Sequence, residues 1–180
     1  MKIFVISDTH GKIDKAIEIY KTLNDIDLIV HLGDLWNDGK RIKDQLNVPL
    51  IGLKGNMDGS FARDGYHIME TEFGKIFLAH GHMENVKQGY DNLMYKAESL
   101  ECKAAFFGHT HVPLFVQVSG MYLLNPGSLA LPAGGRKGSY AVVTIGEKTL
   151  DATILFEDVT QTQKTESGFL KSVLNDSDRF

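Results

Sequence analysis

Short apolar segments alternate with helical patterns over the first third of the chain, and this order limits the fold more than any other feature. Residues 2–6, 28–30 and 50–53 are brief apolar runs rich in isoleucine, valine and leucine, as expected of buried strands. Between them, apolar residues repeat at helical spacing over 13–23, and a more polar helical pattern covers 39–47. Strands that alternate with helices form βαβ units, so we expect a parallel core sheet.

The rest of the chain is richer in strands. One helical pattern, at 93–100, interrupts extended segments that are separated by Gly and Pro. The predicted strands of this part are 66–72, 75–80, 104–107, 114–118, 121–124, 139–145 and 149–156. So many strands predict a second sheet packed on the first, with helices outside. A length of 180 residues favours a single domain over 1–180, in which about 159–180 form a polar C-terminal tail or a short helix.

Composition and charge exclude several classes of protein. With 43% hydrophobic and 23% charged residues, the chain has neither a disordered nor a fibrous composition. A net charge of −4 gives no reason to expect binding to nucleic acid or to an anionic membrane. The single cysteine, Cys102, excludes a C-x-x-C metal or redox site. We find no signal segment and no apolar run long enough to cross a bilayer, so we expect a cytoplasmic protein.

Residues with metal-binding side chains follow five of the predicted strands, usually beside a glycine. The candidate ligands are Asp8, His10, Asp34, Asn56, His80, His109 and His111. Ligands of open α/β sheets bind at the carboxyl ends of the strands, so these side chains are expected to share one pocket. Imidazoles, carboxylates and an amide oxygen together suit divalent manganese, iron or zinc.

The D-x-H and H-x-H spacings support the same centre. In an extended chain, residues two apart point to the same side, so Asp8 with His10, and His109 with His111, are each expected to reach one centre. A single histidine at a strand end is more often hydrogen-bonded than a metal ligand. Five such motifs in this order, each after a strand, favour the metal centre.

The series D-x-H, G-D, G-N-x-D, H-G-H and G-H-T-H resembles the calcineurin-like metallophosphoesterases, and more closely their small bacterial and archaeal phosphodiesterase branch. The resemblance implies an αββα fold in which two mixed sheets are flanked by helices. It also implies two divalent metal ions, with manganese favoured and iron, nickel or zinc as alternatives. By resemblance, one ion is held by Asp8, His10, Asp34 and His111. The other is held by Asp34, Asn56, His80 and His109, with Asp34 shared between them.

The activity implied by the resemblance is hydrolysis of phosphate diesters by a water or hydroxide held between two metal ions. The expected substrate is a small phosphodiester or a nucleotide-like ester. Many relatives have histidine in the third motif as proton donor, but this chain has Met57 there. We therefore assign catalytic roles to His82, Asp58 and Asn56, with His82 as proton donor or substrate contact. The alternative for His82 is a hydrogen bond that orients a metal ligand.

Two other functions fit the same resemblance. The first is a weakly active or inactive metal-binding scaffold for a protein partner, as in the metallophosphoesterase-like subunit of retromer. The second is a nuclease, against which the acidic composition and the absence of extra domains argue. Dimers are common in the family, so a homodimer is an expectation by analogy. Trp36, just beyond Asp34, is expected to cap the core rather than line the pocket.

Overall fold

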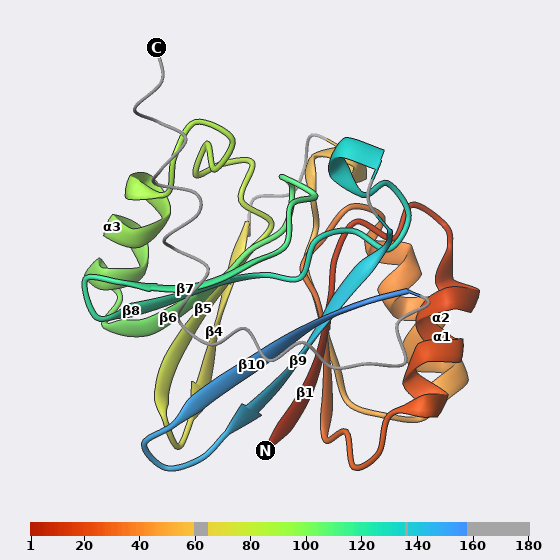
Figure 1. The fold of residues 1–180 in the computed structure, drawn as a ribbon. Coiled ribbons are helices and arrows are strands. Elements are labelled where there is room, and N and C mark those ends of the chain that lie inside the picture. Colours follow the sequence, from red (N-terminus) through yellow and green to blue (C-terminus); the bar gives the residue numbers. More distant parts are fainter. Residues whose placement is uncertain (60–64, 136, 158–180) are drawn as a thin grey trace.

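The computed structural model describes residues 1–59, 65–135 and 137–157. Two five-stranded sheets lie between helices, with α1 (Ile13–Thr22) and α2 (Trp36–Leu46) on one side and α3 (Asp91–Ser99) on the other (Figure 1). This αββα architecture confirms the fold expected from the sequence. The predicted tail at about 159–180 lies outside the described residues.

The first sheet contains the predicted parallel core. Strands β1 (Lys2–Ile6), β2 (Leu28–His31) and β3 (Leu50–Gly52) run parallel. Strand β9 (Ser139–Ile145) pairs antiparallel with β1, and β10 (Leu150–Phe156) pairs antiparallel with β9. The strand order is β10-β9-β1-β2-β3, so the last two strands of the chain extend the sheet on the side of β1.

The second sheet has the order β4-β5-β6-β8-β7. Strands β5 (Gly74–Ala79), β6 (Cys102–Phe106) and β8 (Met121–Asn125) run parallel in its centre. Strands β4 (Tyr66–Thr71) and β7 (Leu114–Val118) pair antiparallel at its two edges. Each sheet therefore has three parallel strands whose carboxyl ends meet at one side, where site residues can gather.

Alternation along the strands builds three apolar layers. In β1, Ile3 and Val5 face the other sheet, whereas Phe4 packs with the residues beneath α1 and α2. The layer between the sheets also contains Leu78 and Phe106 from the second sheet. A third layer joins the outer face of that sheet to α3. The sheets are thus held face to face by a continuous core, which fixes the position of one set of strand ends relative to the other.

Helix α2 begins at Trp36, three residues before the helical pattern expected at 39–47. The backbone N–H of Trp36 donates a 2.7 Å hydrogen bond to Oδ1 of Asp58, which lies in the short 3-10 helix η1 (Asn56–Asp58). A carboxylate from a distant segment thus satisfies the first turn of α2, which local sequence cannot reveal. Of the helices that the structure describes, none is long and apolar enough to cross a membrane.

Candidate metal centre

The candidate ligands come from tight loops in which the backbone is left-handed. Five of the seven have positive φ, which is uncommon for residues other than glycine and costs about 1–2 kcal/mol each. These residues are Asp8 (φ 53°), His10 (φ 42°), Asp34 (φ 56°), His109 (φ 65°) and His111 (φ 58°). Strain of this kind persists where the surrounding structure enforces it, and it gathers at functional sites.

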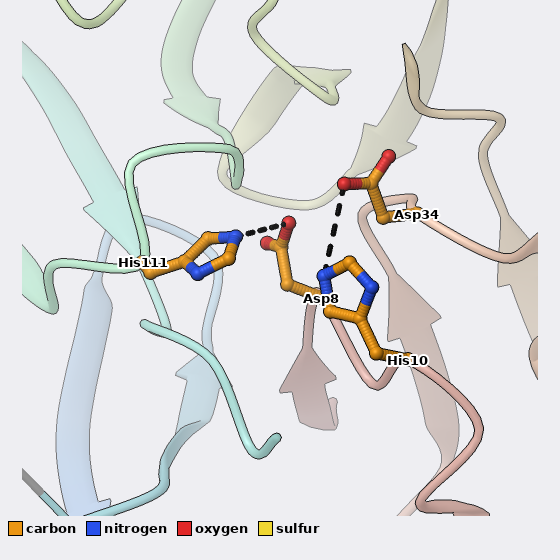
Figure 2. A group of neighbouring side chains, drawn as sticks. All are labelled: Asp8, His10, Asp34 and His111. Carbon is orange, nitrogen blue, oxygen red and sulfur yellow. Dashed lines mark ion pairs between the residues drawn. The ribbon is translucent and has the colours of Figure 1, made fainter. Parts of the chain in front are cut away.

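Four of the candidates form one cluster of ligand atoms. One atom from each of Asp8, His10, Asp34 and His111 lies within 4.8 Å of the others. Figure 2 shows their side chains turned toward one another, Asp8 and His10 from the loop after β1, Asp34 from the loop after β2 and His111 from the loop after β6. Both carboxylates are almost fully buried, at 0% exposure for Asp8 and 3% for Asp34. Two buried carboxylates this close together repel one another unless a metal ion or a proton neutralises part of their charge.

The ring of His111 is oriented for ligation. Its Nδ1 lies 2.6 Å from the carbonyl oxygen of Leu131, which can only accept, so Nδ1 carries the proton. The lone pair of Nε2 then faces Oδ1 of Asp8 at 3.0 Å. Two acceptors at this distance need a cation between them, either a proton or a metal ion. Metal-binding histidines commonly donate their second N–H to a carbonyl in this way.

The pKa values of this pair reflect the contact between the two side chains. The contact with Asp8 raises the pKa of His111 above its ordinary value, although burial opposes it. Burial by itself raises the pKa of Asp8, but the contacts with His111, His80 and Ser7 lower it to about 2. Both shifts favour a positive charge at this point of the site.

His10 offers a free ligand atom to the same cluster. Its Nε2 is buried and accepts or donates no hydrogen bond among the described residues. The nearest carboxylate atom is Oδ2 of Asp34, at 3.9 Å. An unpartnered buried nitrogen of this kind is costly in a metal-free protein, and an ion between His10 and Asp34 would remove that cost.

Asn56, His80 and Asp34 meet on the other side of the centre. The Nδ1 atom of His80 lies 2.9 Å from the Leu32 carbonyl oxygen, so Nδ1 carries a proton, and in the neutral ring Nε2 carries the lone pair. That Nε2 lies 3.1 Å from Oδ1 of Asn56 and 3.3 Å from Oδ1 of Asp34. Three acceptor atoms therefore converge on one point, which is the arrangement that a metal ion requires.

His109 joins this second group. Its ring centroid lies 5.1 Å from that of His80. Burial, together with the charges of His80 and Lys87, lowers the pKa of His109 to about 4. The imidazole is therefore neutral at physiological pH, which is the form that binds metal.

The H-x-H motif does not act through an extended chain. His109 and His111 both adopt left-handed backbone conformations, and Asp8 and His10 do the same. His111 lies against Asp8, whereas His109 lies beside His80. The backbone of these motifs is therefore not extended as expected, although Asp8 and His10 still reach one cluster. The turn sends the two rings to different halves of the site.

Of the three residues assigned to catalysis, Asn56 lies beside His80, whereas His82 and Asp58 have different surroundings. The ring of His82 lies 5.3 Å from that of His80 between centroids, and its Nδ1 is buried without a hydrogen bond from the described chain. Burial and the charge of His80 lower the pKa of His82. Both carboxylate oxygens of Asp58 accept hydrogen bonds from backbone N–H groups, Oδ1 from Trp36 at 2.7 Å and Oδ2 from Gly55 at 2.8 Å. Asp58 therefore holds the loops of Asp34 and Asn56 together.

A buried network that the sequence did not reveal braces two ligand loops. The backbone N–H of Gly33 donates to Nδ1 of His31 (3.3 Å), which leaves Nε2 of His31 to donate to Thr9 Oγ1 at 2.9 Å. The Thr9 hydroxyl donates to Oδ2 of Asp38 at 2.7 Å, and the Gly11 N–H donates to the same oxygen at 2.7 Å. The network fixes both neighbours of His10 and the residue before Asp34.

Asn125 and Ser128 brace the remaining loops. Asn125 donates through Nδ2 to the Gly108 carbonyl at 2.9 Å and to Thr110 Oγ1 at 3.0 Å. The Ser128 hydroxyl donates to the carbonyl oxygen of Asp8 at 2.8 Å. Local sequence does not reveal these contacts, because the partners are distant along the chain.

Known proteins share this sequence pattern and this fold. The model of the calcineurin-like phosphoesterase superfamily domain matches residues 1–148. The chain is 34% identical to the probable metallophosphoesterase YsnB of Bacillus subtilis, over 88% of this chain and 91% of that one. It is 27% identical to phosphodiesterase YfcE of Escherichia coli, over 79% of this chain and 87% of that one.

Solved structures agree. A predicted phosphoesterase from Streptococcus pneumoniae is 28% identical, covers 87% of this chain and 90% of its own, and superposes with a TM-score of 0.70. The zinc complex of Vps29 from Entamoeba histolytica, at 23% identity, shares the fold with a TM-score of 0.74 over 91% of this chain and 96% of its own. The ligand geometry, the matched domain and these relatives agree: the chain belongs to the calcineurin-like phosphoesterase superfamily and is a metallophosphoesterase.

Proposed function

We propose that the protein hydrolyses phosphate diesters at a centre of two divalent metal ions, manganese being the first choice and iron, nickel or zinc the alternatives. The observation that carries the proposal is the position of Asp34. Its Oδ2 faces Nε2 of His10 at 3.9 Å, and its Oδ1 faces Nε2 of His80 at 3.3 Å. One carboxylate thus lies between two groups of ligands, as a shared ligand must.

Charge and geometry support binding of a phosphate ester. Asp8, His10, Asp34 and His111 would hold one ion, and Asp34, Asn56, His80 and His109 would hold the other. Two divalent ions would lower the pKa of water and neutralise phosphoryl oxygens as charge develops. Asp8 and Asp34 would neutralise only two of the positive charges of two divalent ions. The metal-loaded site would therefore stay positive and attract an anionic ester.

The side chains around the ions have separate tasks in this proposal. His82 donates a proton to the leaving oxygen, because Met57 at the position of the usual donor has no proton to give. Asp58 acts as a positioning residue through its two backbone contacts. A small phosphodiester or nucleotide-like ester is the proposed substrate, and the cytoplasmic location and homodimer stay predictions.

The first experiment measures hydrolysis of bis-p-nitrophenyl phosphate by protein reconstituted with Mn²⁺, Fe²⁺, Ni²⁺ or Zn²⁺, together with bound metal per chain. We expect turnover, about two ions per chain, and loss of both in Asp34→Asn. Asp44→Asn is the matched control, because Asp44 is an exposed residue of α2. Absence of turnover with every metal, or equal activity in Asp34→Asn, would contradict the proposal.

A second candidate function is a metal-binding scaffold for a protein partner. The exposed apolar side chain of Met57 at the site, 60% accessible, favours it, as does the shared fold with Vps29. Full metal occupancy without hydrolysis of any ester would support the scaffold over the enzyme.

A further inference from the structure

Several exposed apolar residues are next to residues of the metal centre, either in sequence or through a backbone hydrogen bond. Among the residues that the structure describes, nine large hydrophobic side chains are exposed, and five of them adjoin residues of the centre. These five, which we call the apolar rim, are Trp36, Met57, Met83, Val112 and Leu131. Large hydrophobic side chains exposed together mark surfaces that bind something.

Trp36 and Met57 form one flank of the rim. The Met57 N–H donates to Oδ1 of Asp34 at 3.1 Å, and the Trp36 N–H donates to Asp58, the residue after Met57. These contacts hold both residues beside the carboxylate that faces both groups of ligands. Their side chains are nevertheless 42% and 60% exposed, so the expectation that Trp36 caps the core holds only for part of the indole.

Leu131 and Val112 lie on the flank of His111. The Leu131 carbonyl accepts the hydrogen bond from His111 Nδ1 at 2.6 Å, while its side chain is 53% exposed. Val112 follows His111 directly and is also exposed. The rim therefore includes residues that contact two different ligands of the first cluster, Asp34 and His111.

Met83 adds a third element beside His82. A Cβ at Gly65 would meet its Sδ at 2.5 Å, so the thioether lies against the Gly65 backbone, and the side chain is 54% exposed. Methionine sulfur makes favourable contacts with aromatic rings, and an exposed indole offers a flat surface for stacking.

We propose that the apolar rim binds an aromatic ester group of the substrate, so that the protein selects phosphate esters bearing a planar aryl or nucleobase group over small alkyl esters. This inference rests on the proposed function, because the phosphoryl group must lie at the metal centre for its ester groups to reach the rim. A small alkyl group would leave the indole and the thioethers exposed to water.

Trp36 supplies a direct probe, since it is the only tryptophan of the chain. Metal-loaded protein is titrated with phenylphosphonate and with methylphosphonate, neither of which is an ester, while the indole emission is recorded. We expect phenylphosphonate to change the emission saturably and to bind at least about fivefold more tightly than methylphosphonate. Met57→Ala and Met83→Ala should reduce this preference, whereas Tyr95→Ala, at an exposed position of α3, should not.

Kinetics test the same preference in turnover. Bis-p-nitrophenyl phosphate and methyl p-nitrophenyl phosphate share one leaving group, so the ratio of their kcat/KM values reports the retained group. We expect a ratio of about ten or more, reduced at least about fivefold in Trp36→Ala and unchanged in Tyr95→Ala.

Equal affinity for the two phosphonates with unchanged emission would overturn the inference and assign the rim to a protein partner. An equal loss in Tyr95→Ala would overturn it too. Failure of the proposed function has a different signature: phenylphosphonate binds with the Trp36 signal, but no diester is hydrolysed.

Discussion

His111 Nε2 lies 3.0 Å from Oδ1 of Asp8, although Asp8 follows β1 of the first sheet and His111 lies in the loop after β6 of the second. The contact joins the two sheets across the metal centre. Asp8 raises the pKa of His111, so without a metal ion the contact favours a proton on the His111 ring.

Metal binding should therefore compete with protons. The raised pKa of His111 stabilises the metal-free fold below the ordinary histidine pKa of 6.5, and this stability is lost as pH rises through the folded pKa. Mn²⁺ must displace that proton, so its affinity should increase between about pH 6 and pH 8. Calorimetry in buffers of different ionisation enthalpy should detect proton release on binding. His111→Gln should lose the release, whereas His67→Gln, at an exposed position of β4, should keep it.

The buried carboxylate of Asp38 should control both stability and metal affinity. Asp38→Ala leaves the Thr9 hydroxyl and the Gly11 N–H without their acceptor, which costs about 2–4 kcal/mol of unfolding free energy. Because these groups flank His10, we also expect metal affinity to fall about 10- to 100-fold. Urea unfolding and metal titration measure the two effects. Asp44→Ala on the same helix should change neither, and an unchanged metal affinity in Asp38→Ala would show that the network does not position His10.

Gly108 should not tolerate a side chain. A Cβ there would overlap Ser7 Oγ and lie 2.9 Å from Oδ2 of Asp8, so Gly108→Ala must displace the carboxylate that His111 contacts. We expect a loss of about 1–3 kcal/mol of stability and a clear loss of bound metal. Gly39→Ala in α2 is the matched control, because its Cβ meets Leu50 at an acceptable 3.4 Å. Since alanine favours helix over glycine, that control should be neutral or stabilising. Normal metal content in Gly108→Ala would contradict the prediction.

The role of His82 can be separated from simple structural support by varying the leaving group. If His82 donates a proton, His82→Gln should slow hydrolysis of alkyl esters about 10²- to 10⁴-fold and affect p-nitrophenyl esters much less. Burial lowers the pKa of His82, so the rate ratio of alkyl to p-nitrophenyl ester should rise as pH falls toward that pKa. Equal losses for both leaving groups would instead assign His82 to ligand orientation. His67→Gln serves as the control.

The order of strands and helices was predictable because it depends on local periodicity. Short apolar runs, and extended segments bounded by Gly and Pro, located all ten strands of the described residues, and the βαβ order required the parallel core. The candidate ligands were predictable for the same reason: each lies in the loop after a strand, and strand ends gather at one side of a sheet, whereas metal binding itself stays a prediction. The start of α2 was not, because it depends on Asp58 from another segment.

Which ligand faces which was decided by tertiary structure alone. Left-handed turns at His109 and His111 send their rings apart, against the same-face expectation for an extended H-x-H. The Leu131 and Leu32 carbonyls select the ring nitrogens that point inward, and both belong to segments remote from the histidines they orient. Sequence thus determined which chemical groups reach the strand ends, because short-range patterns encode strands. Only packing of the two sheets decided their mutual orientation, because that depends on hydrogen bonds between residues far apart in the chain.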